Sequence, residues 1–123
     1  LDDENCFTIL AGCDEDNQPY GYSVVRIQDK VAHGLWSGII PERRGEGRYR
    51  KLQLTALNES RIRGAETFDA YIAEDTPTAA KTLRMHKNLG CITVDSFPDF
   101  TMRGGERHEF TNHHVIMSLM TGK

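Results

Sequence analysis

Apolar residues recur along this chain with two different periods, which together predict strands and helices in a fixed order. Near the start, short stretches in which apolar and polar residues alternate loosely predict three consecutive strands. These lie at 5–13, 20–28 and 31–40, with turns at 14–19 and 29–30. Because the connections are short, the three strands are expected to form an antiparallel meander.

The next apolar positions follow a helical period. In residues 48–64, Leu52 and Ala56 lie on one strip of a helix, and Gly64 supplies a C-terminal stop. The short apolar run 68–73 is typical of a buried strand. We expect it to pair in parallel with the strand at 31–40 through a right-handed crossover.

A second helix is indicated by its end signals. Thr76 can cap its N-terminus, Pro77 suits its first position, and Gly90 can end it. Two more strands are predicted at 91–97 and 109–120, separated by Pro98 and a turn at 103–107. The predicted order is β-β-β-α-β-α-β-β, an α/β (α+β) fold with a mixed sheet and helices packed on it.

Length and composition limit what this fold can be. The chain has 123 residues, of which 38% are hydrophobic, which suffices for one core and predicts a single domain spanning 1–123. A formal net charge of -3 argues against broad nucleic-acid binding. No stretch is typical of a signal peptide or a membrane span, so a cytoplasmic protein is expected. Only four residues precede the first strand and the first is Leu, so the domain is expected to be N-terminally incomplete.

The cysteines and histidines raise the questions of a disulfide and a metal site. Three cysteines, an odd number, favour free thiols, with a Cys6–Cys13 bridge as the alternative. A metal site could draw on a group of histidines and glutamates near the C-terminus: His108, His113, His114, Glu106 and Glu109. We expect no metal, because adjacent histidines on a strand face opposite sides, and we expect these histidines to line a strand rim or the acceptor entrance.

The stretch Pro41–Leu52 joins the third strand to the first helix and predicts an anion site. Gly45 and Gly47 can adopt backbone conformations that are barred to other residues, so consecutive amides can point into one concavity at a helix N-terminus. Five cationic side chains surround it: Arg43, Arg44, Arg48, Arg50 and Lys51. In an acidic chain this charge is local, so the ligand should be small and polyanionic. The alternative is an ordinary solvated turn.

Two motifs carry a resemblance to a known family. Arg44-Gly-Glu-Gly47, after a strand and before a helix, matches the R-x-x-G core of R/Q-x-x-G-x-G/A, and 35–40 looks like the bulged strand before it. Thr82-Leu-Arg-Met-His-Lys-Asn-Leu-Gly90 is close to S-L-x-M-H-x-x-L-G-F. The chain thus resembles the GNAT superfamily of acyl-CoA-dependent N-acyltransferases. It departs from the pattern at Tyr49, in place of Gly or Ala, and at Ala79, in place of a helper asparagine. The family's N-terminal strand and two helices are also lacking from the sequence, so a fragment, a natural short member, or a gap filled by another copy is expected.

The resemblance implies acetyl-CoA as cosubstrate. Its pyrophosphate would bind the amides of the motif, and its pantetheine chain would follow the backbone of the preceding strand. The implied cofactor-binding residues are Ile39, Ile40, Arg44, Gly45, Glu46, Gly47, Arg48, Tyr49 and Arg50.

Amine acylation needs a base, an oxyanion donor and an acid. By resemblance, the acid near the thioester sulfur is His86, with a merely packed histidine as the alternative, and the oxyanion donor is the N–H of Ile39. Glu74 is the predicted general base, directly or through a bound water, because it and Asp75 follow the strand expected beside the thioester. The alternative role of both, favoured for Asp75, is to form the turn and add negative charge at the N-terminus of the next helix. On a regular strand, His33 and Trp36 would lie on opposite faces, with Trp36 in the core.

The function implied is transfer of an acetyl group from acetyl-CoA to a primary amine of a small molecule. The alternatives are a non-catalytic CoA-binding or structural module and, in a different fold, a nucleotide-phosphate site. Neither a nucleic acid nor a membrane is an expected partner. If the chain is truncated, an exposed sheet edge or face favours a homodimer.

Overall fold

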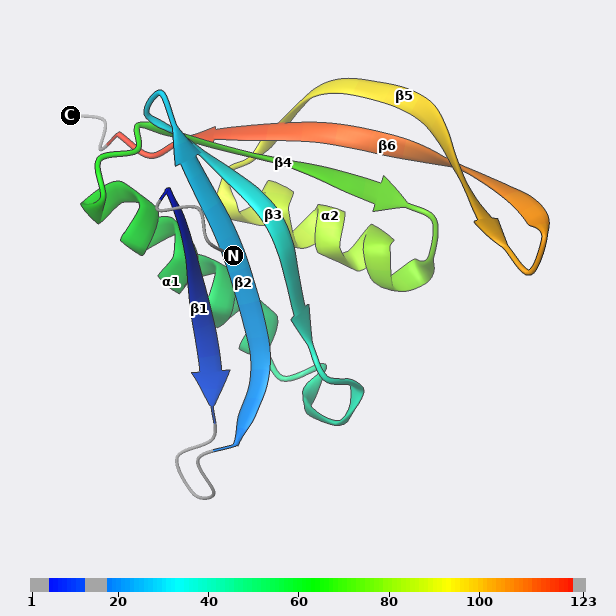
Figure 1. Ribbon diagram of the computed structural model, residues 1–123, viewed down its shortest axis with the longest axis horizontal. Coiled ribbons are helices and arrows are strands. Elements are labelled where there is room, and N and C mark those ends of the chain that lie inside the picture. Colours follow the sequence, from blue (N-terminus) through cyan, green and yellow to red (C-terminus); the bar gives the residue numbers. More distant parts are fainter. Residues whose placement is uncertain (1–4, 13–17, 121–123) are drawn as a thin grey trace. The chain divides into compact units, whose positions relative to one another are not determined.

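The computed structural model describes residues 5–12 and 18–120 and confirms the predicted order of elements (Figure 1). The elements are β1 (Cys6–Gly12), β2 (Pro19–Gln28), β3 (Val31–Ile39), the 3-10 turn η1 (Pro41–Arg43), α1 (Arg48–Ile62), β4 (Thr67–Glu74), α2 (Pro77–Leu89), β5 (Ile92–Arg103) and β6 (Glu106–Ser118). The strands form a mixed sheet in the order β1-β2-β3-β4-β6-β5. The chain divides into two compact units, 69–117 and the remainder, and each is described by itself.

The first unit is built on the predicted antiparallel meander. β1 pairs with β2 and β2 with β3. Asp29 and Lys30 connect β2 to β3 with φ angles of 54° and 67°, which is the geometry of a two-residue hairpin turn. Helix α1 packs on β1, β2 and β3. The core of this unit includes Val25, Ala32, Leu52, Ala56 and Phe68.

Strand β3 contains the bulge that the resemblance implied. The register with β2 shifts so that Val24 faces Trp36 while Val25 faces Gly34, leaving Leu35 as the extra residue. The inserted residue reverses the alternation, so His33 and Trp36 lie on the same face of the strand rather than on opposite faces. Trp36 is 57% exposed, so its assignment to the core was wrong.

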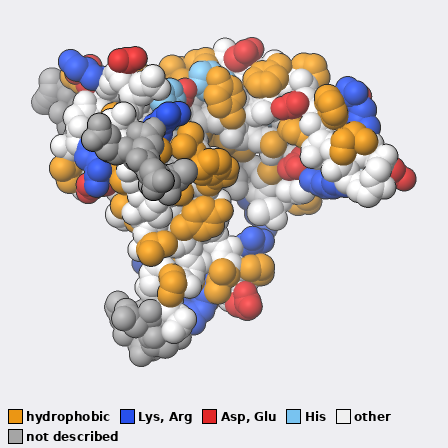
Figure 2. Space-filling view, in the orientation of Figure 1, with side chains coloured by type: hydrophobic (Ala, Val, Ile, Leu, Met, Phe, Trp, Pro, Cys, Tyr) orange, Lys and Arg blue, Asp and Glu red, His pale blue; other side chains and the backbone are white. Residues whose placement is uncertain are grey.

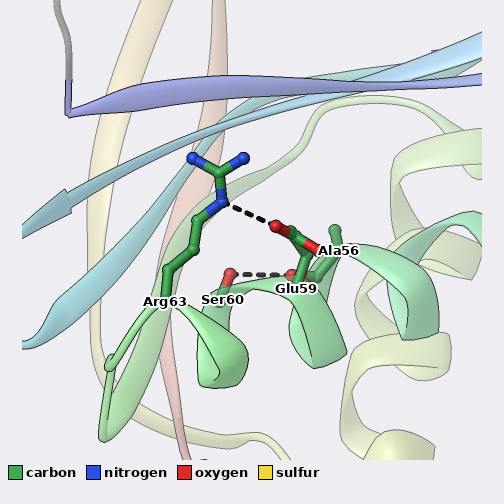
Figure 3. Close-up of polar contacts among 4 residues, drawn as sticks. All are labelled: Ala56, Glu59, Ser60 and Arg63. Carbon is green, nitrogen blue, oxygen red and sulfur yellow. Dashed lines mark hydrogen bonds and ion pairs between the residues drawn. The ribbon is translucent and has the colours of Figure 1, made fainter.

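The C-terminal end of α1 is held by polar contacts (Figure 3). The fully buried Ser60 hydroxyl donates to the Ala56 carbonyl at 2.7 Å, and Arg63 pairs with Glu59 at 2.7 Å. The Arg63 guanidinium also lies 4.3 Å from the centre of the Phe7 ring. This cation–π contact joins the end of α1 to strand β1.

In the second unit, α2 begins and ends as predicted. The Thr76 hydroxyl accepts a hydrogen bond from the Ala79 amide at 3.1 Å, Pro77 is the first helical residue, and Gly90 is the C-cap, with a φ of 116°. Leu83 and His86 are the buried residues of α2. The sheet contributes Ile72 and Val115 to the buried core.

The last two strands are longer than predicted. β5 continues to Arg103, and β6 starts at Glu106. The turn is only Gly104-Gly105, with φ angles of 57° and 82°, because two glycines in the left-handed region close a two-residue hairpin. Pro98 does not end β5, because β5 is an edge strand, where a missing N–H need not break the ladder.

Large apolar side chains remain on the surface, and orange groups mark such side chains on the face shown in Figure 2. The most exposed include Leu10, Ile62, Tyr71, Ile92 and Met120. β1 and β5 are the edge strands. A homodimer stays a prediction, as do the single domain and the cytoplasmic location. Among the described residues, neither helix is long and apolar enough to cross a membrane.

The free thiols Cys6 and Cys91 differ in burial, and Cys13 lies outside the described residues. Cys91 is 4% exposed, and burial raises the pKa of its thiol to about 11. Because the thiolate is the nucleophile, we expect iodoacetamide at pH 8 to alkylate Cys91 at least about 100-fold more slowly in the native protein than in urea. Peptide mass spectrometry measures this. Equal rates would contradict the burial of Cys91.

Candidate functional site

The predicted anion site is the glycine loop, residues 44–47, between η1 and α1. Gly45 and Gly47 have φ angles of 91° and 76°, and no described atom lies within 4 Å of where a Cβ would stand on either. Gly47 is the N-cap of α1, and no described side chain caps this helix. The loop therefore presents open backbone at a helix N-terminus, where the partial positive charge favours anions.

Two arginine side chains form hydrogen bonds that hold the loop in place. Arg44 donates through Nε to the Ile39 carbonyl at 2.8 Å, and Arg48 donates to the Arg43 carbonyl at 2.9 Å. Arg48 also pairs with Glu46 at 2.6 Å. These bonds tie the loop to the end of β3 and fix its path, so in this structure both guanidinium groups hold the backbone of the site.

The end of β3 is the predicted pantetheine path. Ile39 is buried, and its carbonyl accepts the Arg44 bond. Ile40 is exposed, and its amide donates to the Tyr20 carbonyl at 2.8 Å. A ligand following this strand would compete for the Ile39 carbonyl or use other backbone groups.

Tyr49 points toward the sheet. Its hydroxyl lies 2.6 Å from the Ser37 Oγ on β3, and burial raises the pKa of the phenol. The ring therefore contacts β3 from the first turn of α1. This explains how the chain accommodates a large residue where the motif has Gly or Ala.

We expect Tyr49→Phe to leave the affinity for CoA within about twofold, because it keeps the ring and removes the hydroxyl that bonds Ser37 on β3. Tyr49→Ala should lower the free energy of unfolding by about 3 kcal/mol. Calorimetric titration and urea denaturation measure the two effects. A tenfold loss of affinity in the phenylalanine variant would mean that the hydroxyl contacts the ligand.

A shallow cavity of about 190 Å³ lies next to the loop in the first unit. Its lining residues come from β1, β2 and α1: Ile9, Leu10, Ala11, Gly12, Tyr20, Arg48, Lys51, Leu52 and Thr55. Arg48 lines this cavity and also forms hydrogen bonds that hold the loop. Its guanidinium lies 5.4 Å from the centre of the Tyr20 ring.

Glu74, the predicted base, lies at the end of β4 in the second unit and is bonded to a histidine. Its Oε1 is 2.8 Å from the Nε2 of His113, whose Nδ1 is 2.8 Å from the Ser96 Oγ. Sequence reasoning did not find this three-residue chain. The sequence suggested for His113 a place at a strand rim or acceptor entrance, or a metal site, and no signal in the sequence gives the pairing that places Ser96 opposite His113.

A second histidine pair lies on the opposite face of β6. His114 is 2.8 Å from Asp69 and stacks on Tyr71, with ring centres 4.3 Å apart. The two adjacent histidines thus have separate partners, as strand alternation predicts. Among the described residues, no three His, Cys, Asp or Glu side chains are grouped to hold a metal ion.

His86, the predicted acid, lies in the interior of the second unit. It is 3% exposed, and its Nδ1 is 2.9 Å from the Thr82 carbonyl one turn earlier. Burial lowers the pKa of His86, against a smaller opposite effect of the bond to Thr82. The neutral imidazole therefore predominates at neutral pH.

Solved structures with the same fold provide the comparison. The chain superposes on the ribosomal-protein-S18-alanine N-acetyltransferase from Escherichia coli with a TM-score of 0.80 and 12% identity, covering 98% of this chain and 74% of that one. The chain has the acyl-CoA N-acyltransferase (GNAT) fold. This confirms the fold that the two motifs implied.

Two further structures show how broadly this GNAT fold is shared. The IAA acetyltransferase from Bacillus cereus has a TM-score of 0.75 and 12% identity, with coverage of 93% of this chain and 78% of that one. The spermidine/spermine N-acetyltransferase from Vibrio cholerae has a TM-score of 0.78 and 18% identity, with coverage of 96% and 68%. No protein-family model and no curated protein matches the sequence. At these identities, the likeness establishes the fold alone.

Proposed function

We propose that this GNAT-fold protein transfers an acetyl group from acetyl-CoA to a primary amine of a small molecule. The observation that carries the proposal is the glycine loop. Its two left-handed glycines leave backbone open at the N-terminus of α1, in a chain with an acyl-CoA N-acyltransferase fold.

The residues of the loop fit a pyrophosphate. Helix-terminal amides and glycine backbone can approach phosphate oxygens closely, because no Cβ intervenes at residues 45 and 47. Arg50 and Lys51 are exposed in the first turn of α1, where they can add charge-assisted bonds. Arg44, Arg48 and Glu46 would act mainly by holding the loop, given the bonds they make.

We assign the proton transfers to residues of the second unit. Glu74 takes the proton from the attacking amine, and its bond to His113 fixes the direction of the carboxylate. His86, in its protonated form, supplies the proton to the departing thiolate. The backbone N–H of Ile39 is the proposed donor to the oxyanion.

The fold does not select the acceptor. Structures of similar fold include enzymes named for an alanine of a ribosomal protein, for IAA and for spermidine or spermine. The acceptor panel must therefore contain peptide N-termini, polyamines and small primary amines.

The test is a thermal shift with CoA, followed by thiol release from acetyl-CoA in the presence of the panel. We expect CoA to raise the Tm and at least one amine to give turnover. A rise in Tm without turnover would support the alternative, a non-catalytic CoA-binding module, which the burial of His86 also favours. Protection by ATP but not by CoA would contradict both.

A further inference from the structure

Three side chains from three strands of the second unit form one hydrogen-bonded chain. Ser96 on β5 lies directly opposite His113 on β6, with Oγ and Nδ1 2.8 Å apart. The other ring nitrogen of His113 is 2.8 Å from Oε1 of Glu74, which ends β4. The imidazole is therefore held at both nitrogens, by a hydroxyl on one side and a carboxylate on the other.

The hydrogen-bond partners determine where the protons lie. An ionised carboxylate can only accept, so Nε2 of His113 carries the ring proton and donates it to Glu74. In the neutral ring, Nδ1 then has a lone pair and accepts from the Ser96 hydroxyl. A serine hydroxyl bonded to an imidazole that a carboxylate orients is the arrangement that activates a nucleophile.

The three side chains of this hydrogen-bonded group differ in their exposure to solvent. The His113 side chain is 15% exposed and that of Glu74 is 44% exposed, while Ser96 is exposed to solvent. An acyl carbonyl can thus reach the Ser96 oxygen, whereas the base is largely shielded from water. Ser96 lies on the strand at an edge of the sheet.

From this geometry we infer that Ser96 is a nucleophile that accepts an acyl group from activated esters. The Ser96 oxygen forms a bond to the acyl carbon, and its proton passes to Nδ1 of His113. The ester bond to the leaving alcohol or phenol breaks, and that group takes the proton back from His113. The products of this step are the Ser96 ester and the free alcohol. Water then attacks the ester carbonyl and gives a proton to Nδ1 of His113; the bond between the acyl carbon and the Ser96 oxygen breaks, Ser96 takes that proton, and the carboxylic acid is released.

The reaction shares Glu74 with the proposed N-acetyl transfer but requires no CoA and no residue of the first unit, so release of p-nitrophenol can be observed whether or not the protein transfers acetyl groups from acetyl-CoA. The probe is p-nitrophenyl acetate. We expect a burst of p-nitrophenol, and one acetyl group on the peptide that contains Ser96, located by mass spectrometry.

Single-residue variants distinguish activation of Ser96 by His113 from simple exposure of Ser96 to solvent. We expect Ser96→Ala to abolish the adduct and His113→Gln to slow the burst by about 100-fold. The matched controls are His114→Gln, which alters the adjacent histidine that bonds Asp69, and Ser118→Ala, which removes another exposed serine of the sheet. Both should react at the wild-type rate.

Three results would overturn the inference: no adduct on the wild-type protein, an adduct on another residue, or an unchanged burst in His113→Gln. Because loss of a hydrogen bond could unfold the unit, the Tm of each variant is measured first. If His113→Gln is unfolded, Glu74→Gln takes its place, because it removes the orienting carboxylate and should also slow the burst.

Discussion

Replacing Gly47 with Asp lowers the affinity for CoA by about 100-fold or more. Gly47 is the N-cap of α1, and open space lies where its side chain would stand. An aspartate would place a negative charge there, and two like charges ~4 Å apart repel by about 4 kcal/mol near a protein surface. Calorimetric titration with CoA measures the loss, since each 1.4 kcal/mol is about tenfold in Kd.

Two matched variants separate the two causes of this loss of affinity, the added negative charge and the loss of the glycine backbone conformation. Gly47→Asn has nearly the same shape without the charge, so its loss of affinity should be about tenfold or less. Gly104→Asp places the same residue at a φ of 57°, also with open space, but in the β5–β6 turn. It should leave the affinity unchanged. If Gly47→Asp remained folded and bound CoA as the wild type does, the assignment of the loop would fail.

The sequence predicted the conformation of the glycine loop because its determinants are local, while anion binding by this loop stays a prediction. Glycines at 45 and 47, the apolar strand before them and the helical period after them are read directly from neighbouring residues. The same holds for the ends of α2, where Thr76, Pro77 and Gly90 have the predicted roles.

Features that depend on pairing between distant residues were not predicted. The resemblance implied a bulge in this strand but did not place it at Leu35, and the opposite faces expected of His33 and Trp36 on a regular strand therefore do not apply. The direction of Tyr49 follows from a bond to Ser37 twelve residues earlier. Likewise, Ser96 and His113 meet only because the register of β5 and β6 brings them opposite each other.

The second large expected effect is the loss of turnover when His86 is replaced, and the size of this loss depends on pH. Replacing His86 with Phe should lower the turnover of acetyl transfer about 100-fold at pH 6.5 and leave the Kd for CoA within about twofold. An acid must be protonated, and burial lowers the pKa of His86 below its ordinary value. The ratio of wild-type to variant turnover should therefore fall as the pH rises from 6 to 8. Initial rates of thiol release across this range measure the ratio.

Leu83→Ala is the control for packing, because Leu83 is the other buried residue of α2 and carries no proton. It should lower the free energy of unfolding by about 2 to 5 kcal/mol. Its turnover relative to the wild type should not vary with pH while both proteins are folded. If His86→Phe behaves like Leu83→Ala, or if it loses turnover and CoA affinity equally, His86 stabilises the unit by packing and by its bond to the Thr82 carbonyl. The proton for the thiolate would then come from another group.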